Sequence, residues 1–359
     1  MDTLSRPSID DVRDAAQRIA PYVHRTPVVT CRTLSDLCGA RLYFKCENLQ
    51  RVGAFKARGA HNAVFSLPEQ EAARGVLTHS SGNHGAALAL AARNRRVPAI
   101  IVMPKNAPVI KRRAVEGYGA RVVTCEPTLD SRESTAEREL AATGATFVHP
   151  YDNPRVIAGA GTAALELLEE VPSLDIIMTP VGGGGLISGT AISATSLRPD
   201  IRVIGGEPAG ADDAYRSFRE GTLYPQEDPQ TIADGLRTSL SPRTFGIIQE
   251  LVHDIVTASE ESIVRAMRLV WERAKLVIEP SSAVPLAALM EGKVDLGGQG
   301  GRGGRGNRDD LDSQGNSGDL DSLGDRDERG DQGDRAIDPR LKVGIILSGG
   351  NVDLDHLPW

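Results

Sequence analysis

The stretch that most constrains the fold of this chain is "DIIMTPVGGGGLISGTAISA" at residues 175–194. A short apolar run precedes four successive glycines, Gly182, Gly183, Gly184 and Gly185, and a second apolar segment of helical length follows them. This order predicts a buried strand, a tight turn and a helix, as in parallel α/β sheets. Because backbone N–H groups at the start of a helix attract anions, the turn predicts a phosphate site. It lacks both GxGxxG spacing and a following Lys-Ser or Lys-Thr, which argues against a dinucleotide fold or a P-loop.

The same alternation of strand and helix continues on both sides of this stretch. Short β-rich apolar runs predict further strands at 41–47, 75–80, 98–104, 120–126, 146–150, 201–208 and 341–350. Segments of helical periodicity or composition predict helices at 9–23, 56–67, 83–96, 107–119, 130–143, 157–171, 185–197 and 261–277. Such alternation indicates parallel sheets that helices cover on both faces.

The composition is that of a globular protein with no bias toward nucleic acid or membrane. Of the 359 residues, 40% are hydrophobic and 25% are charged, and the net charge is -7. This acidic balance, with only 4% aromatic residues, argues against nucleic acid as the main partner. The apolar runs are too short to cross a bilayer, and the polar N-terminal segment is unlike a signal peptide. We therefore expect a cytoplasmic protein whose cysteines are reduced thiols.

One segment, residues 297–335, departs from this pattern because it contains little besides Gly, Asp, Arg, Asn, Ser and Gln. Its opening "GGRGGRG" is similar to RNA-binding tracts, and its Asp-Gly rhythm is similar to calcium-binding repeats. Neither motif keeps its period, and the segment has too little apolar surface to offset the entropy of ordering. We interpret it as a disordered insertion in a surface loop. A non-catalytic ligand- or RNA-binding protein, with this segment as the working part, is the remote alternative.

Two further stretches carry reactive or polar residues near predicted helix starts. In "GAFKARGA", Lys56 has apolar neighbours that can desolvate its amine, lower its pKa and make it a nucleophile, although a solvated lysine would also fit. In "THSSGNHGAALALAA", Ser80, Ser81, Asn83 and His84 precede or open a helix. Free backbone amides and polar side chains at a helix start suit a bound carboxylate, or else form an ordinary N-cap.

A fourth stretch, "IILSGGNVD", places Ser348 at the end of an apolar strand, where open α/β sheets bind ligands. A phosphate site, a reactive amine, a carboxylate site and this hydroxyl are together what pyridoxal phosphate acting on an amino acid requires. The motifs "GAFKARGA", "SSGNHG", "GGGGL" and "SGGNVD" occur in the order expected of fold-type-II (tryptophan-synthase-β-like) enzymes. The chain resembles the serine racemase and serine/threonine dehydratase family over nearly its whole length, apart from 297–335.

The resemblance implies an α/β fold with two doubly wound parallel-sheet domains and the active site between them. The large domain would comprise residues 1–74, 150–296 and 336–359. The small, mobile domain would comprise residues 75–149 and would close over the substrate. The resemblance also implies a homodimer.

The resemblance further assigns roles around the cofactor, pyridoxal 5'-phosphate. Lys56 would bind its aldehyde covalently and then act as the general base that removes the substrate's α-proton. Loss of the β-hydroxyl would convert L-serine to pyruvate, or L-threonine to 2-oxobutanoate, with release of ammonia. The remaining implied contacts are Phe55 beside the ring, Asn83 at the ring hydroxyl, Ser348 at the ring nitrogen, and Gly182, Gly183, Gly184, Gly185 and Leu186 at the phosphate.

The substrate would be a small hydroxy amino acid, and the resemblance implies how the site holds it. Ser80, Asn83 and His84 would bind the α-carboxylate. Ser81 matches a second acid/base on the face opposite the lysine, which would permit racemisation of serine. Arg132 matches an arginine near the substrate's carboxyl region, so 3-hydroxyaspartate is a further possible substrate.

Two regulatory features of the family have matches outside these motifs. The segment "EPAGADD" resembles its divalent-cation site, with Glu207, the carbonyl of Ala211 and Asp213 as oxygen ligands for Mg²⁺ or Ca²⁺. Mammalian-type racemases of the family also bind ATP between subunits. The positions that match this ATP site are Tyr118, Lys275 and Asn351, whereas Arg51, Val52 and Ala86 replace an expected lysine, threonine and glutamine. These replacements argue against ATP as an effector.

Overall fold

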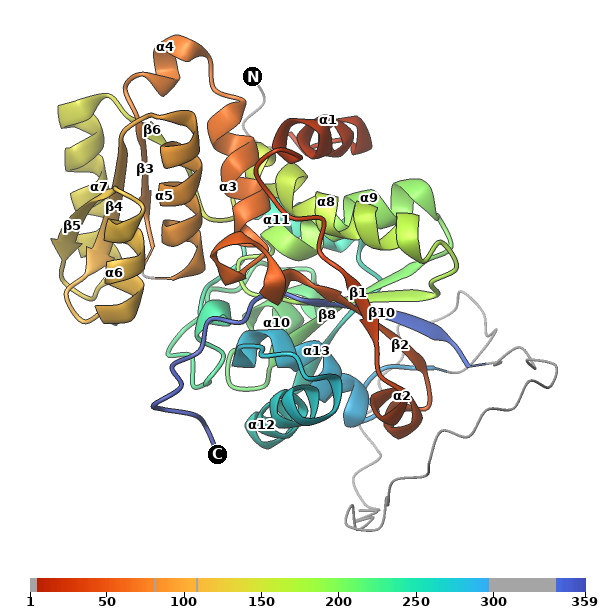
Figure 1. Ribbon diagram of the computed structural model, residues 1–359. Helices are drawn as coiled ribbons and strands as arrows, with labels where there is room; N and C mark the ends of the chain where they lie inside the picture. Colours follow the sequence, from red (N-terminus) through yellow and green to blue (C-terminus); the bar gives the residue numbers. More distant parts are fainter. Residues whose placement is uncertain (1–4, 81, 108, 297–339) are drawn as a thin grey trace.

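The structure is a computed structural model that describes residues 5–80, 82–107, 109–296 and 340–359 (Figure 1). It contains a six-stranded sheet in the order β1-β2-β10-β7-β8-β9 and a four-stranded sheet in the order β5-β4-β3-β6. We call the parts built around these sheets the large lobe and the small lobe. The strands are β1 Val28–Thr30, β2 Arg41–Cys46, β3 Val76–His79, β4 Ala99–Pro104, β5 Arg121–Cys125, β6 Thr146–Phe147, β7 Ile176–Pro180, β8 Arg202–Pro208, β9 Asp254–Ala258 and β10 Lys342–Leu347.

The predicted parallel α/β architecture is confirmed. Every pair of neighbouring strands is parallel except β1 and β2. The last strand, β10, lies between β2 and β7, with Ile345 opposite Phe44 on one side and Met178 on the other. The predicted insertion at 297–335 lies outside the described residues. The division into domains at 75 and 149 stays a prediction, although the small-lobe strands fall between these positions.

Helices cover both faces of each sheet. In the large lobe, α8 and α9 lie on one face, while α2, α12 and α13 pack on the other (Figure 1). In the small lobe, α3 and α5 contribute to the core on one face, and α7 contributes to the core on the other. The helices are α1 Ile9–Ile19, α2 Arg32–Cys38, α3 Lys56–Phe65, α4 Glu69–Ala72, α5 Asn83–Arg95, α6 Val109–Gly117, α7 Leu129–Thr143, α8 Pro154–Glu170, α9 Gly185–Leu197, α10 Asp213–Glu220, α11 Pro242–Leu251, α12 Glu260–Leu269 and α13 Pro280–Met290.

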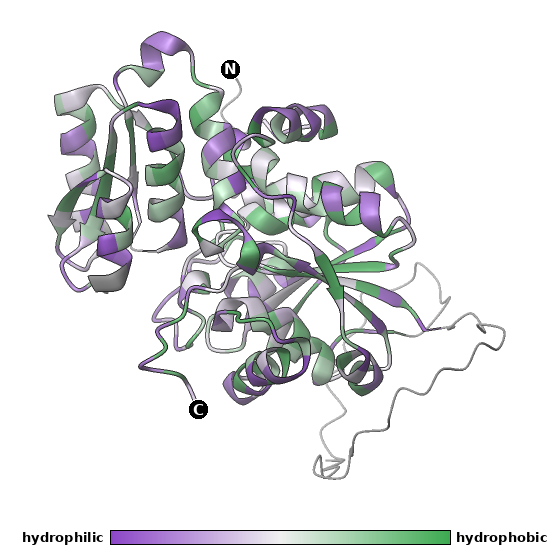
Figure 2. Cartoon of the chain, in the orientation of Figure 1, coloured by the Kyte–Doolittle hydropathy of each residue, from purple (hydrophilic) through white to green (hydrophobic). Residues whose placement is uncertain are grey.

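The hydropathy of the elements follows this layering. The inner strands are hydrophobic, and the outer helices carry hydrophilic residues on their outward sides (Figure 2). All five residues of β7 and all six of β4 are buried, as expected for strands covered on both faces. In the described part of the chain, no helix has both the length and the apolar character that crossing a membrane would require.

Two helix predictions had different outcomes. Helix α1 begins as predicted after Ser8, whose hydroxyl accepts from the Asp11 N–H while the Asp11 carboxylate accepts from the Ser8 N–H. The single helix predicted at 261–277 was wrong at its C-terminal end. Helix α12 ends at Leu269, a π-helical turn follows at Val270–Ala274, and Lys275 then adopts a left-handed φ of 59°. A left-handed residue cannot continue a right-handed helix, so the chain turns there.

Helix α3, which begins at Lys56, is anchored by a buried ion cluster. The Arg58 guanidinium is fully buried and pairs with Glu47 (Nε to Oε2, 2.7 Å) and Glu166 (Nη1 to Oε1, 2.7 Å). The buried Lys45 amine donates to the same Glu166 at 2.6 Å and to the Thr26 carbonyl at 2.7 Å. Two cations and two carboxylates thus balance, which offsets the cost of burying each charge.

Helix α3 is also packed unusually closely against α8. A Cβ atom placed on Gly159 of α8 would lie 2.7 Å from the Arg58 carbonyl oxygen and 2.7 Å from the Gly59 Cα. Such distances are too short for any side chain, so only glycine permits this approach of the two backbones. The contact places the start of α3 against the helix that leads to β7 and the glycine turn.

Candidate active site

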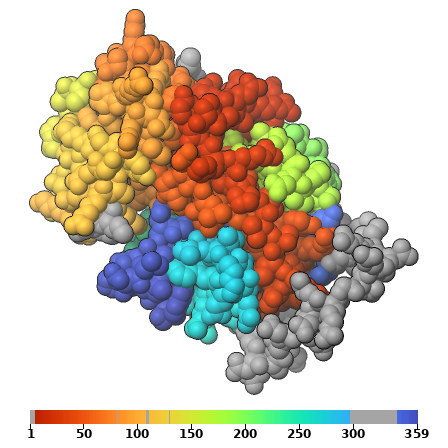
Figure 3. Space-filling view, in the orientation of Figure 1, coloured from red at the N-terminus to blue at the C-terminus, as the bar shows by residue number. Residues whose placement is uncertain are grey.

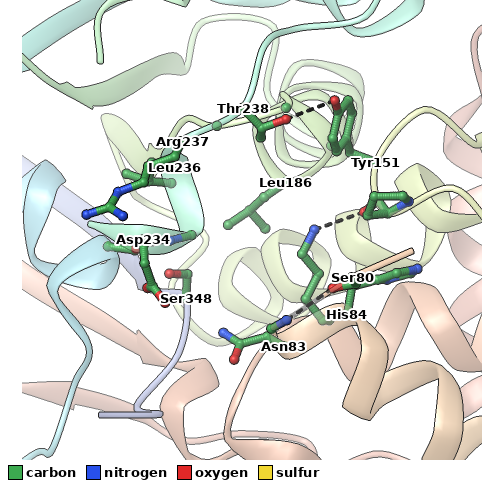
Figure 4. Close-up of a pocket in the computed structure, with 18 of the residues that line it drawn as sticks. Ser80, Asn83, His84, Tyr151, Leu186, Asp234, Leu236, Arg237, Thr238 and Ser348 are labelled. Carbon is green, nitrogen blue, oxygen red and sulfur yellow. Dashed lines mark hydrogen bonds between the residues drawn. The ribbon is translucent and has the colours of Figure 1, made fainter. Parts of the chain in front are cut away.

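A cavity of about 420 Å³ lies where strand ends of the two lobes face each other (Figure 4). Ser80 follows β3, Gly182 follows β7 and Ser348 follows β10, and all three line it. These are carboxyl ends of parallel strands, where open α/β sheets bind ligands. Of the residues predicted for the cofactor and substrate, the structure brings together Phe55, Lys56, Ser80, Asn83, His84, Arg132, Gly182, Gly183, Gly184, Gly185, Leu186 and Ser348. Ser81 lies outside the described residues.

Lys56 places its amine in this cavity from the first turn of α3. Its Nζ donates to the Pro150 carbonyl oxygen at 2.9 Å and lies 5.0 Å from the centre of the Phe55 ring. Burial lowers the pKa of Lys56 to about 8, although the carboxylate of Glu279 acts in the opposite direction. A larger share of this amine is therefore neutral at physiological pH than for a solvated lysine, and a neutral amine is a nucleophile and a base.

The glycine turn lies at the N-terminus of α9, with the side chain of Tyr151 packed against it. Gly184 precedes the helix with a left-handed φ of 83°. A Cβ on Gly183 would lie 2.3 Å from Cδ1 of Tyr151, and one on Gly185 would lie 2.9 Å from its Cβ. Larger residues therefore cannot replace these glycines without displacing Tyr151. The turn and the helix N-terminus together fit a phosphate group.

The start of α5 forms another wall of the cavity. Asn83 Nδ2 lies 3.1 Å from both carboxylate oxygens of Glu279, and the Asn83 Oδ1 accepts from Asn351 Nδ2 at 3.0 Å. The buried His84 ring contacts the Val148 carbonyl oxygen through Nε2 at 3.2 Å, and burial lowers the pKa of His84 to about 3. The ring is therefore neutral, and the attraction for an anion at this helix start comes from the backbone N–H groups.

Ser348 is held at the far side of the cavity. Its hydroxyl lies 3.0 Å from the Ser282 hydroxyl, which also donates to the Gly349 carbonyl at 2.7 Å. Arg132 approaches from α7 in the small lobe, with its Nε 3.4 Å from the Thr128 carbonyl oxygen. The cavity is therefore lined from both lobes.

Sequence reasoning assigned no role to several residues of the site. Glu279 is buried against Asn83, and burial, with the nearby Asp234, raises the pKa of Glu279 to about 7. The Tyr151 hydroxyl lies 3.0 Å from the Thr238 hydroxyl. Lys111 of the small lobe forms an ion pair with Asp234 of the large lobe. Glu279 lies just before Pro280, a typical first residue of a helix, so the sequence pattern indicates an ordinary helix start and not a cavity carboxylate.

Two of the predicted cation ligands, the carboxylates of Glu207 and Asp213, lie near each other, and none of the three predicted ligands lines this cavity. The Glu207 carboxylate accepts from the N–H groups of Ala214 (3.2 Å) and Tyr215 (2.8 Å). Asp213 Oδ1 is buried and has no hydrogen-bond partner. Burial raises the pKa of Glu207, with Asp213 adding repulsion, and burial raises the pKa of Asp213 to about 7. Within the described ranges, no three His, Cys, Asp or Glu side chains gather into a metal-binding group. Two crowded carboxylates with an unpaired oxygen nevertheless suit a cation.

A second cavity, of about 680 Å³, adjoins the first and shares Asn83, Lys111 and Asp234 with it. Tyr118 and Asn351 line it together with Val52 and Ala86, whereas Lys275 and Arg51 are not among its lining residues. The C-terminal segment borders this cavity, and the Trp359 ring packs at 5.2 Å against the Trp271 ring. In Figure 3 this segment (blue) lies beside the residues near 270 (cyan). The structure thus brings together Tyr118 and Asn351, two of the three positions that match the family's ATP site, while the expectation that ATP is not an effector stays a prediction.

The chain matches known proteins along most of its length. Residues 19–302 match the model of the family described as "Pyridoxal-phosphate dependent enzyme". The chain is 44% identical over 353 residues to a protein of Paracoccus denitrificans (strain Pd 1222) named beta-hydroxyaspartate dehydratase, with 98% of this chain and 99% of the relative covered. It is 45% identical over 363 residues to a serine racemase of Dictyostelium discoideum, with 99% and 98% covered. The crystal structure of a threonine deaminase from the organism abbreviated T.th. aligns with a TM-score of 0.81 and 39% identity, covering 97% of this chain and 99% of that one.

The close contact between Gly183 and Tyr151 generates a first prediction. In Gly183→Ala the new methyl group displaces the Tyr151 ring from the turn, so we expect affinity for pyridoxal phosphate to fall at least about tenfold. Titration of the cofactor-free protein, followed by absorbance, measures this affinity. The matched control is Gly246→Ala, because no atom lies within 4 Å of its added Cβ on α11. Equal affinity for the Gly183 variant and the wild type would contradict the prediction.

Proposed function

This chain belongs to the family of pyridoxal-phosphate dependent enzymes, and we propose that it is a serine/threonine dehydratase, that is, an ammonia-lyase. It would convert L-serine to pyruvate, or L-threonine to 2-oxobutanoate, with release of ammonia. The observation that carries the proposal is the amine of Lys56, half-buried and placed with the glycine turn in one cavity that both lobes line. The threonine deaminase that aligns with the chain supports it.

The residues of the cavity fit pyridoxal phosphate. The glycine turn presents backbone N–H groups at the start of α9, where a Cβ on Gly183 would clash with the Tyr151 ring, and Lys56 offers an amine of lowered pKa. When bound, the cofactor supplies an electron sink for the bond broken at the substrate's α-carbon. The residues that would hold it are Lys56 at the aldehyde, Phe55 beside the ring, Asn83 at the ring hydroxyl, Ser348 at the ring nitrogen, and Gly182, Gly183, Gly184, Gly185 and Leu186 at the phosphate.

The chain's own residues would move the proton and orient the substrate. Lys56, once its amine is freed by the incoming substrate, would take the α-proton as general base, which its lowered pKa favours near neutral pH. Ser80, Asn83 and His84, at or beside the start of α5, would bind the α-carboxylate, since the helix N-terminus attracts negative charge. The α-proton and the departing β-hydroxyl together make up the water that is eliminated, and water then hydrolyses the released enamine to the keto acid and ammonia.

Two other reactions of the same site are favoured by particular observations. The Dictyostelium relative is named a serine racemase. Ser81, which lies outside the described residues, would supply the second acid/base that racemisation of serine needs. The Paracoccus relative is named beta-hydroxyaspartate dehydratase, and Arg132 lines the cavity. A guanidinium there would pair with the second carboxylate of 3-hydroxyaspartate.

We further propose a divalent cation, Mg²⁺ or Ca²⁺, at Glu207, Asp213 and the carbonyl of Ala211. The unpaired oxygen of Asp213 and the raised pKa values of both carboxylates support it, because a bound cation would relieve their repulsion. A homodimer stays an expectation from the family resemblance, and a cytoplasmic location stays an expectation from the composition of the sequence. Membership of an enzyme family argues against a purely ligand- or RNA-binding role.

The central prediction concerns Lys56. We expect Lys56→Ala to lower keto-acid release from L-serine and L-threonine by at least about a thousandfold, because the general base and covalent anchor are both lost. The visible absorbance of the bound cofactor should disappear with it. In the cofactor-free wild type, the rate at which added cofactor is bound should rise through about pH 8, since only the neutral amine attacks the aldehyde. Lys105→Ala, an exposed lysine on the small lobe, is the control. Retention of activity by Lys56→Ala would refute the proposal.

The racemase alternative is tested at Ser81. If Ser81 serves the second face, Ser81→Ala abolishes formation of D-serine from L-serine and leaves elimination from L-serine within about threefold of the wild type. Both products are measured in the same incubation, with Ser134→Ala as an exposed-serine control. Equal loss of both products would show that Ser81 has another role.

The cation proposal predicts stabilisation by Mg²⁺ or Ca²⁺. At a concentration near one hundred times the Kd, the cation should stabilise the wild type by about 2.7 kcal/mol, seen as a higher midpoint of thermal unfolding. Asp213→Asn should lose this response, whereas the exposed Asp200→Asn should keep it. A wild type that responds to neither cation would contradict the site.

A further inference from the structure

Two hydroxyl groups meet on the wall of the candidate active site. The Tyr151 hydroxyl lies 3.0 Å from the Thr238 hydroxyl, and both residues line the cavity (Figure 4). Tyr151 belongs to the segment that joins β6 to α8, and Thr238 to the connection between α10 and α11. The contact therefore joins two parts of the chain that are distant in sequence.

Tyr151 is held in one position by its surroundings. Its ring packs on the glycine turn so closely that a Cβ on Gly183 would lie 2.3 Å from it. The ring also contacts His149 edge-on, with 4.5 Å between the ring centres. The backbone N–H groups of Tyr151 and Asp152 both donate to Nδ1 of His149, at 3.3 and 2.8 Å. The hydroxyl is thus fixed in place before any ligand enters.

The pair leaves one hydrogen-bond donor unused. In a contact between two hydroxyls, one donates to the other, and the second keeps its own hydrogen. Neither hydroxyl has another hydrogen-bond partner among the described residues. Burial raises the pKa of Tyr151, so the phenol stays protonated at neutral pH. One O–H group on the cavity wall is therefore free to donate to an oxygen of a bound molecule.

The location of Thr238 favours the substrate over the cofactor phosphate as the acceptor. The turn from Gly182 to Gly185 is buried. Leu236 and Leu240 of the same loop pack on this turn, whereas Thr238 is half-buried beside Arg237, which is exposed. In the proposed reaction the start of α5 holds the substrate's α-carboxylate and Lys56 reacts at its α-carbon. The remaining polar group of a β-hydroxy amino acid is the oxygen on its β-carbon.

We propose that the Tyr151–Thr238 pair donates a hydrogen bond to the oxygen on the substrate's β-carbon and so selects β-oxygenated amino acids. The assignment rests on the proposed function and adds a specificity-determining element to it. The shared chemistry is a hydroxyl donor facing an oxygen acceptor, which the cofactor phosphate could also provide. The experiment must therefore distinguish a hydrogen bond to the oxygen on the substrate's β-carbon from a hydrogen bond to the cofactor phosphate.

The test compares two substrates that undergo the same elimination. L-Serine carries the β-oxygen, whereas β-chloro-L-alanine carries chloride in its place and also gives pyruvate and ammonia. We expect Tyr151→Phe and Thr238→Val each to lower kcat/KM for L-serine about five- to tenfold and to leave kcat/KM for β-chloro-L-alanine within about twofold of the wild type. Tyr224→Phe removes a phenol hydroxyl that donates to Glu220 and does not line the cavity, so it is the matched control.

Each of the remaining outcomes would overturn the proposal. Equal losses with both substrates, with weaker cofactor binding in the absorbance titration, would assign the donor to the phosphate and overturn the proposal. Equal losses with unchanged cofactor binding would show a purely structural role, and no loss with either substrate would also overturn it. Thr238→Val serves as the second variant if Tyr151→Phe does not fold. A wild type that binds the cofactor but releases no keto acid from either substrate would refute the proposed function, and this inference with it.

Discussion

The site depends on the position of one amine, that of Lys56, at the start of a helix that contacts in the protein interior hold in place. Lys56 opens α3, and two residues later Arg58 pairs with Glu47 and Glu166 in the interior. Because a buried charge without its partner is costly, this cluster allows α3 little freedom to shift. The backbone contact between Gly59 and Gly159 fixes the same helix against α8. The Pro150 carbonyl then holds the Lys56 amine within the cavity.

Burial shifts the pKa values of two ionisable groups of the cavity, Lys56 and Glu279, in opposite directions, and both shifts favour neutral forms. It lowers the pKa of Lys56 to about 8 and raises the pKa of Glu279 to about 7. His84 is buried and His149 is half-buried, and this loss of solvent contact lowers both pKa values and keeps both rings uncharged near neutral pH. Near neutral pH the cavity interior thus carries less charge than its ionisable residues would carry at their ordinary pKa values. Proton transfer in such a site does not require that strongly hydrated charged side chains first lose their water.

The segment from His149 to Asp152 connects the two lobes and contributes to the site at each position. The His149 ring accepts two backbone N–H groups, the Pro150 carbonyl holds Lys56, and the Tyr151 ring covers the glycine turn. The Asp152 carboxylate pairs with Arg243 at the start of α11. Movement of the small lobe would therefore be transmitted directly to the amine and to the turn. This link gives a physical basis for coupling between lobe position and the state of the site.

The sequence by itself determined the local elements and the chemical groups they carry. Alternating apolar runs were sufficient to predict the parallel sheets, and the four glycines, Lys56 and Ser348 were recognisable from their places at strand and helix ends. Local patterns are sufficient for these predictions because the alternation of residues in a strand, a glycine turn and the start of a helix each depend on residues that are close in sequence. They misplaced the end of the helix predicted at 261–277, where a π-helical turn intervenes. Only the tertiary structure decided that Glu279 faces Asn83 and that Tyr151 meets Thr238. Those pairs are separated by 196 and 87 residues, and their contact depends on how whole helices and strands pack, which no local pattern encodes.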